Sequence, residues 1–169
     1  AFDENNTLLK LGRIRIRLYP NPFRNGDFSQ LLKLSDGSIY IQGKNKSANA
    51  TIHLWVEMHR PVIHAAIRSN KNIKISACYE TWRSADHTVS GRENLQNSYK
   101  FAPQGTVRML KDKIAFDKNG IVFFHRNPDT TIFDVTVHQQ QLDKIKTTLF
   151  NPLKHLTSVG FITGTGLVP

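Results

Sequence analysis

The chain has 169 residues, a length that suits one domain with its own hydrophobic core. Hydrophobic residues make up 39% and charged residues 21%, which is not the composition of a disordered chain. The sequence contains no run of 18 apolar residues, so no membrane-spanning helix is predicted. The net charge is +10, but basic residues are spread along the chain among acidic ones, so we expect a solvated surface rather than a nucleic-acid interface. The only cysteine, Cys78, excludes an intramolecular disulfide.

The clearest pattern lies near the start of the chain. From Arg13 to Leu18 the sequence reads RIRIRL, so aliphatic residues alternate with three arginines. Successive side chains of a strand point to opposite faces, which predicts a strand with one aliphatic and one cationic face. Tyr19-Pro20-Asn21-Pro22 then ends it, because proline lacks the backbone donor that a sheet requires.

Further short extended segments follow in close succession. Strands are predicted at residues 12–18, 28–34, 38–42, 51–57, 62–69, 73–81, 106–110 and 121–125, with extended segments at 113–116, 131–137 and in the tail 158–169. Asp36-Gly37 and Asp117-Lys118-Asn119-Gly120 indicate hairpin turns. The predicted core comprises Ile14, Ile16, Leu18, Ile52, Leu54, Val56, Ile73 and Ile75.

This succession of strands predicts an all-β fold, an antiparallel two-sheet β-sandwich in a single domain spanning residues 1–169. Only residues 139–148 could form a short helix. Residues 84–104 are polar and lack a period, which predicts a long irregular loop.

Motifs of catalysis and cofactor binding are absent from the sequence. There is no phosphate-binding glycine loop and no HExxH motif, and no cofactor is predicted. His53, His59 and His64 could meet across a hairpin, but no carboxylate or cysteine lies at ligand spacing, so we expect no metal site. The acids in the middle of the chain have no obvious partner, so we expect no catalytic residues; these acids are Glu57, Glu80, Asp86 and Glu93.

Two groups of residues at strand ends are candidates for ligand binding. One comprises Trp82 and Arg83, and the other comprises His125, Arg126 and Asn127. Aromatic rings can cover the apolar face of a sugar while planar polar groups bond its hydroxyls. The alternative is structural, with Trp82 at the edge of the core and the polar side chains bonding turn carbonyls, and the sequence favours this alternative.

Four blocks, in order along the chain, carry a resemblance to a known family. They are AFDENNTLLKLGRIRIRLYPNPF at the start, WVEMHRPVIHAAI at 55–67, YETWR at 79–83 and GIVFFHRN at 120–127. Together they resemble the N-terminal β-sandwich domain of uncharacterised, mostly Bacteroidetes proteins related to glycoside hydrolase family 95. In that family the sandwich precedes an (α/α)₆ barrel, which is expected to carry the catalytic carboxylates.

The resemblance implies a non-catalytic domain that shapes a glycan site completed by a helical barrel that is missing here. It also implies a secreted or periplasmic protein, although the first residues do not read as a signal peptide. Two alternatives stay open. The chain could be a free-standing module that binds carbohydrate or a protein partner, or a polyanion-binding module that uses the +10 charge.

Overall fold

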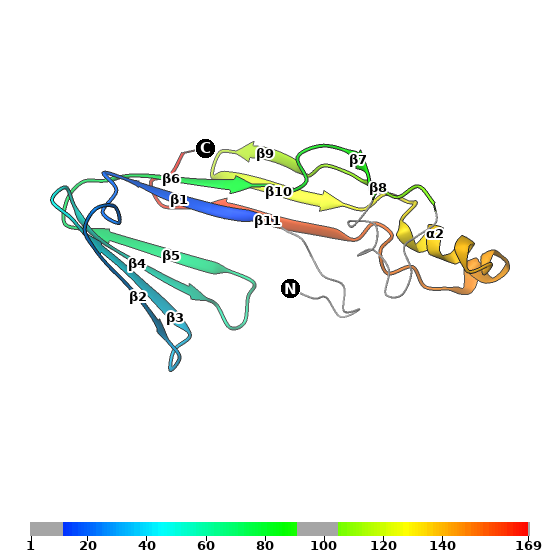
Figure 1. The fold of residues 1–169 in the computed structure, drawn as a ribbon, viewed down its shortest axis with the longest axis horizontal. Helices are drawn as coiled ribbons and strands as arrows, with labels where there is room; N and C mark the ends of the chain where they lie inside the picture. The colour runs from blue at the N-terminus through cyan, green and yellow to red at the C-terminus, as the bar shows by residue number, and fades with distance from the viewer. Residues whose placement is uncertain (1–11, 91–104, 169) are drawn as a thin grey trace. The chain divides into compact units, whose positions relative to one another are not determined.

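The computed structural model describes residues 12–90 and 105–168. The regular structure is predominantly antiparallel β-sheet, with one short α-helix in the described part, so the predicted all-β class is confirmed (Figure 1). No helix in these two ranges has the length and apolar character needed to cross a bilayer. The chain divides into two compact units, described separately: an amino-terminal unit, residues 15–78, and a carboxy-terminal unit, residues 1–14 with 79–169.

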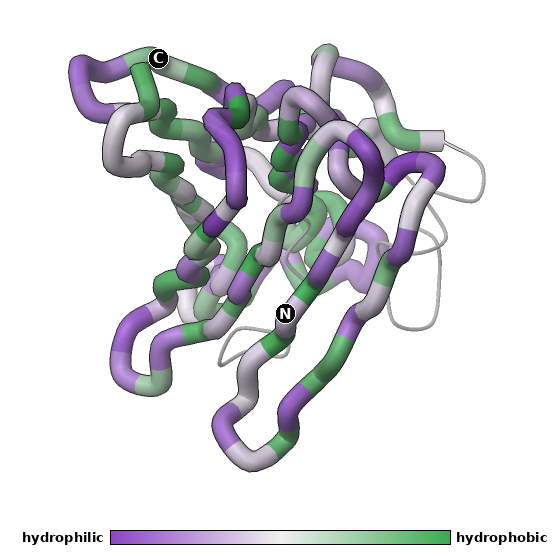
Figure 2. Tube along the Cα trace, turned by 90° about the vertical axis from the view of Figure 1, so that its left-hand side faces the viewer, coloured by the Kyte–Doolittle hydropathy of each residue, from purple (hydrophilic) through white to green (hydrophobic). Residues whose placement is uncertain are grey.

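The amino-terminal unit is built on a four-stranded antiparallel meander. Its strands, in spatial as in chain order, are β2 (Asp27–Lys33), β3 (Ser38–Lys44), β4 (Asn49–Val56) and β5 (Ile63–Ser69). The register sets Ile41 opposite Ile52 and Ile52 opposite Ile67, which makes one face of the sheet aliphatic. The period-two alternation that predicted these strands is visible along them in Figure 2.

The aliphatic face is covered at one end by strand β1 (Arg13–Tyr19), which pairs with β6 (Lys74–Glu80). Leu18 packs on Ala50 and Ile52, and all three side chains are buried. Six partly buried residues surround them: Ile16, Phe23, Ile41, Leu54, Ile67 and Ile73. This packing of the four-stranded sheet against the two-stranded β1–β6 ribbon forms the sandwich-like core of the unit.

Two residues predicted to be core are exposed. Ile14 is 49% exposed, and Val56 is 65% exposed. Val56 is the last residue of β4 and lies opposite Ile63, which is 70% exposed, so this end of the aliphatic face lies beyond the part that Leu18 covers. Alternation identified the correct face of β4 but could not show how far along the strand the cover extends.

The opposite face of the meander carries a row of stacked rings. Tyr40 stacks on His53, His53 on Trp55 and Trp55 on His64, with ring centroids 4.4, 4.7 and 4.7 Å apart. Tyr40 and His53, and likewise Trp55 and His64, are paired across neighbouring strands, whereas His53 and Trp55 lie two residues apart on β4. The two histidines are therefore spaced by an indole ring rather than converging on a common ligand.

The carboxy-terminal unit contains a three-stranded antiparallel sheet in the order β11-β10-β9, formed by β9 (Lys113–Asp117), β10 (Gly120–Arg126) and β11 (Thr157–Thr163). The predicted hairpin joins β9 to β10, with Asp117 opposite Gly120. The Tyr79 ring stacks on Phe123 of β10. The two-residue strands β7 (His87–Thr88) and β8 (Arg108–Met109) pair separately, so the strand predicted at 106–110 is much shorter than expected.

One predicted extended segment is helical. Residues 131–137 are rich in β-branched side chains, yet α2 spans Ile132–Gln139. The Thr131 backbone N–H donates to the Asp134 carboxylate at 2.7 Å, the return bond of a capping box, and this local bond starts the helix against the β propensity. The predicted helix at 139–148 is instead a 3₁₀ helix, η1 (Asp143–Thr148). Residues 91–104 of the predicted loop lie outside the described residues.

Candidate functional site

Two strand ends singled out in the sequence meet at one buried carboxylate in the carboxy-terminal unit. Arg83 follows β6, His125 lies in β10, and Asp112 immediately precedes β9. Arg83 Nε is 2.6 Å and His125 Nδ1 is 3.2 Å from the same oxygen, Oδ1 of Asp112. The exposed fractions of these side chains are 9% for Arg83, 2% for Asp112 and 11% for His125. We call these three residues the Arg–Asp–His cluster.

The Asp112 carboxylate is fully engaged by donors. Its Oδ2 accepts hydrogen bonds from the Tyr79 hydroxyl, at 3.0 Å, and from the Thr81 hydroxyl. Its own backbone N–H donates to the Arg83 carbonyl at 2.9 Å. Burial acts to raise the pKa of Asp112, but the bonds from Thr81 and Arg83 and the Arg83 charge outweigh it and hold the pKa below its usual value. Asp112 is therefore an ionised acceptor at neutral pH.

The surroundings of His125 favour its neutral form, because its pKa lies below the usual value. Burial and the nearby Arg83 charge lower its pKa, in that order of size. Asn127 Nδ2 donates to the Leu153 carbonyl, so Asn127 Oδ1 faces His125 Nε2 at 3.2 Å and requires the proton on Nε2. Nδ1 lies 3.2 Å from Asp112 Oδ1 but makes no hydrogen bond to the described residues.

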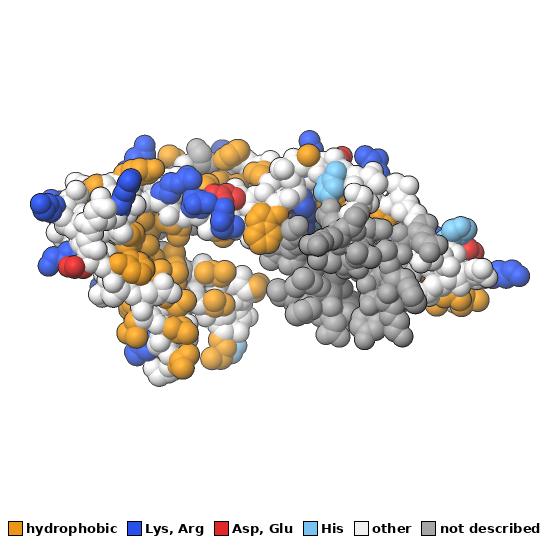
Figure 3. Space-filling view, in the orientation of Figure 1, with side chains coloured by type: hydrophobic (Ala, Val, Ile, Leu, Met, Phe, Trp, Pro, Cys, Tyr) orange, Lys and Arg blue, Asp and Glu red, His pale blue; other side chains and the backbone are white. Residues whose placement is uncertain are grey.

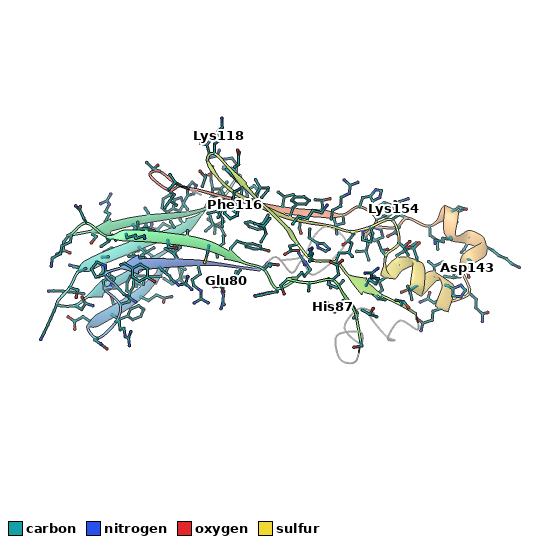
Figure 4. All side chains as sticks on the ribbon, turned by 90° about the horizontal axis from the view of Figure 1, so that it is seen from above. Glu80, His87, Phe116, Lys118, Asp143 and Lys154 are labelled. Carbon is teal, nitrogen blue, oxygen red and sulfur yellow. The ribbon has the colours of Figure 1, made fainter. Side chains whose placement is uncertain are left out.

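An open cleft lies on one side of the cluster. Its lining combines basic, hydroxyl and apolar side chains. The lining residues are Thr81, Arg83, Ser84, Lys111, Asp112, Lys113, Ile114, Ala115 and Phe124. Lys113 Nζ lies 5.9 Å from the centre of the Phe124 ring. Glu80 and His87, labelled in Figure 4, bracket the segment that supplies Thr81, Arg83 and Ser84.

A second, much smaller cavity adjoins the same cluster. It is lined by Tyr79, Arg83, Asp112, Phe123, Phe124, His125, Ser158 and Val159. His125 lines this cavity and does not line the cleft. Arg83 and Asp112 of the cluster line both the cleft and the cavity, whereas His125 lines the cavity alone.

Sequence comparison places the chain in a family. The family model DUF5703_N, described as a domain of unknown function (DUF5703), matches residues 1–169. The chain belongs to the DUF5703 family. No curated protein and no solved structure matched the chain.

The five predicted binding residues of this DUF5703 chain have different surroundings. Arg83, His125 and Asn127 are connected through Asp112 and the His125–Asn127 contact. Trp82 precedes Arg83 and is 57% exposed. Arg126 is exposed, lies opposite Thr157 in β11, and lines neither the cleft nor the cavity.

Asp112, which joins the two strand ends, was not predicted as a site residue from the sequence. It stands between two lysines in a KDK triplet, where a solvated acid is the ordinary interpretation. No residue pattern links position 112 to positions 83 and 125, because their contact arises from tertiary packing. Phe124 was missed too, since an aromatic residue inside a strand is more often core than site.

The acids considered in the sequence are engaged elsewhere in the DUF5703 chain. Glu57 binds Arg60 and lies 3.1 Å from His64, and Glu80 pairs with Arg13. The Asp86 carboxylate accepts the Lys111 backbone N–H at 2.8 Å, and Glu93 lies outside the described residues. Across residues 12–90 and 105–168 no three His, Cys, Asp or Glu side chains gather as metal ligands.

Proposed function

We propose that this chain is the non-catalytic β-sandwich domain of a secreted protein related to glycoside hydrolases, and that the cleft beside the Arg–Asp–His cluster forms one wall of a glycan site. The observation that carries the proposal is the cleft itself. Phe124, Ile114 and Ala115 line the same cleft as the basic side chains of Arg83, Lys111 and Lys113. A sugar ring has the matching chemistry, with an apolar face of C–H groups and a rim of hydroxyls.

The buried ion pair suits a wall that orients a ligand. Asp112 and the hydroxyls around it fix the Arg83 guanidinium, whose side chain is 9% exposed. A donor held in place loses little conformational freedom when it binds a ligand, so it contributes more to specificity than a mobile surface lysine. Trp82, next in the chain and 57% exposed, offers a ring at the same strand end.

The chemistry of Asp112 supports a non-catalytic role for this wall. A general acid of a glycosidase needs a raised pKa, so that it is protonated at working pH. The pKa of Asp112 is instead lowered, since the hydrogen bonds and charge of Arg83 and Thr81 outweigh the effect of burial. In this proposal the catalytic carboxylates belong to a helical barrel elsewhere in the parent protein.

The reading frame that encodes the chain provides the first test. We expect it to continue beyond the sandwich into several hundred predominantly helical residues. A reading frame that closes directly after the sandwich would contradict the role of a glycosidase domain and leave the free-standing binding module as the surviving alternative.

Binding is tested with the chain and a panel of neutral oligosaccharides built from xylose, arabinose, galactose and mannose. We expect weak binding in the millimolar range, because half a site desolvates little of its ligand, with amide chemical-shift changes centred on residues 81–84 and 111–115. Trp82→Ala and Lys113→Ala should each weaken it by about fivefold, as for the loss of a contact of about 1 kcal/mol.

The matched control is Lys71→Ala, an exposed lysine in the turn between β5 and β6, which should leave sugar binding unchanged. Salt-dependent retention on heparin or DNA, together with no response to any sugar, would favour the polyanion alternative. Turnover of aryl-glycosides by the isolated chain, abolished by substitution of Glu57, Glu80 or Glu93, would overturn the non-catalytic assignment.

A further inference from the structure

Strand β2 is an open sheet edge in the amino-terminal unit. Its hydrogen-bonded neighbour is β3 alone among the described strands, and the register between the two is unbroken from Asp27–Lys44 to Lys33–Ser38. All seven residues of β2 are exposed. Phe28, Leu31 and Leu32 are each more than half exposed, and hydrophobic side chains reach the surface over this sheet (Figure 3).

Natural proteins usually protect such an edge. The common devices are a short strand, a proline, a bulge or a charge in the middle of the strand. Over seven residues β2 has no proline, its register with β3 shows no bulge, and its charges lie at the two ends. This edge therefore retains an unpaired row of backbone donors and acceptors that another strand can bond.

The sequence of β2, DFSQLLK, is complementary to itself when it is reversed. In an antiparallel pair of two copies centred on Gln30, Asp27 of each copy lies opposite Lys33 of the other. Phe28 lies opposite Leu32 in the same register, and Gln30 faces Gln30. If the register shifted by one residue, the aliphatic face of one copy would continue into the opposite face of the other. A shift by two residues would move Asp27 and Lys33 out of their pairing.

We infer that β2 pairs antiparallel with β2 of a second copy of this chain, about a two-fold axis at Gln30. This dimer joins two four-stranded sheets into one of eight strands and covers the β2 edge of each copy. It is independent of the glycan site, which lies in the carboxy-terminal unit. The interface is isologous, as in most dimers, because the same strand serves both copies.

The charged side chains of β2 also fit pairing with a second copy of the chain. No ion pair among the described residues involves Asp27, so its carboxylate is available to a partner. Lys33 pairs with Asp36 at 2.7 Å, but both side chains are about half exposed, and exposed pairs of this kind exchange partners readily. On the aliphatic face, Phe28 and Leu32, now 58% and 56% exposed, would cover each other across the axis.

The first experiment reverses the charges and measures mass by sedimentation equilibrium. The wild-type chain should dimerise, and Lys33→Glu should shift dissociation to at least tenfold higher concentration, because it places like charges opposite each other at both ends of the interface. The double variant Asp27→Lys/Lys33→Glu restores the complementarity and should restore the dimer.

Lys113→Glu is the matched control because it makes the same charge change at the start of β9, another exposed edge strand that ends in Asp117. It should leave the dimer intact. Circular dichroism of each variant checks that the strands are still formed, so that dissociation is not confused with unfolding.

The second experiment fixes the register. Gln30→Cys places two thiols opposite each other at the axis and should give a disulfide-linked dimer under mild oxidation. Leu34→Cys, 84% exposed just beyond β2, lies several residues from its copy and should not cross-link. The wild-type chain, whose only thiol is Cys78, provides the background.

Each remaining outcome decides against the proposal. A chain that is monomeric at all concentrations overturns it. Dissociation by Lys113→Glu but not by Lys33→Glu assigns the contact to β9. Equal cross-linking at positions 30 and 34, or no rescue by the double charge reversal, indicates non-specific association of exposed apolar surface.

Discussion

The two units of the chain are stabilised by different kinds of interior. In the amino-terminal unit the core cluster is aliphatic, with Leu18 and Ile52 at its centre. In the carboxy-terminal unit a polar contact, between Arg83 and Asp112, is buried as well. An aliphatic core loses stability in proportion to the volume removed, whereas a buried ion pair loses most when only one partner is removed. The two interiors should therefore respond differently to substitution.

The largest effect is expected from Asp112→Ala. It leaves the Arg83 guanidinium, 9% exposed, without its countercharge, and should lower the free energy of unfolding by about 3–5 kcal/mol. Urea denaturation measures this loss. The double variant Arg83→Met/Asp112→Asn removes both charges and should be less destabilised than Asp112→Ala alone. Equal losses in the two variants would show that the charges are not coupled.

A somewhat smaller effect is expected from Ile52→Ala in the aliphatic core. Ile52 is 8% exposed, and truncation of a buried isoleucine costs about 2–5 kcal/mol. Val56→Ala on the same face of β4 is the matched comparison, because Val56 is 65% exposed, and it should change the free energy of unfolding by about 0.5 kcal/mol or less. Similar losses for the two variants would mean that the uncovered end of the sheet is buried in solution.

Two hairpin glycines allow a finer comparison between the units. A Cβ at Gly120 would collide with the Ile162 carbonyl of β11, so Gly120→Ala must separate two strands and should cost about 1–3 kcal/mol. Gly37 has φ +65°, and a Cβ added there would have no neighbouring atom within 4 Å, so Gly37→Ala meets only the left-handed backbone penalty of about 1 kcal/mol. Gly37→Asn should cost less than Gly37→Ala in thermal unfolding, since asparagine tolerates this conformation.

The smallest effect is a pH dependence confined to the polar interior. The pKa of His125 in the folded chain lies below its usual value of about 6.5, so the folded state binds fewer protons than the unfolded state in this range. Its contribution to stability is present above pH of about 6.5 and decreases as the pH falls from there. His125→Gln should flatten the decline of urea midpoints between pH of about 7 and 5. His59→Gln, which removes an exposed imidazole, should not.

Strand periodicity predicted most of the fold because it reports on local geometry. The RIRIRL segment and the two hairpin turns match β1, the β2–β3 hairpin and the β9–β10 hairpin. Alternation also identified the aliphatic face of β4. It could not predict that cover ends before Val56, since that depends on where a distant ribbon lies. Propensity failed at residues 131–137, where one capping bond between Thr131 and Asp134 starts a helix.

Less of the candidate site could be predicted. Strand ends followed by polar residues directed attention to Arg83 and His125, and these two lie on one carboxylate. The carboxylate itself, Asp112, carries no local signal, because neither its spacing nor its neighbours distinguish it from a surface acid. Which side chains line the cleft, and which line the smaller cavity, depends on how the end of β6 packs on β10, and no sequence period encodes that packing.

The row of stacked rings gives the two units separate optical signals. The chain has two tryptophans, Trp55 in the amino-terminal unit and Trp82 in the carboxy-terminal unit. Trp55 lies between the imidazoles of His53 and His64, whereas Trp82 is 57% exposed. A partly buried, stacked indole and an exposed indole differ in their emission, so the two tryptophans should give distinguishable fluorescence signals. Variants that keep only one of the two tryptophans would then follow the unfolding of each unit separately, by its own fluorescence emission.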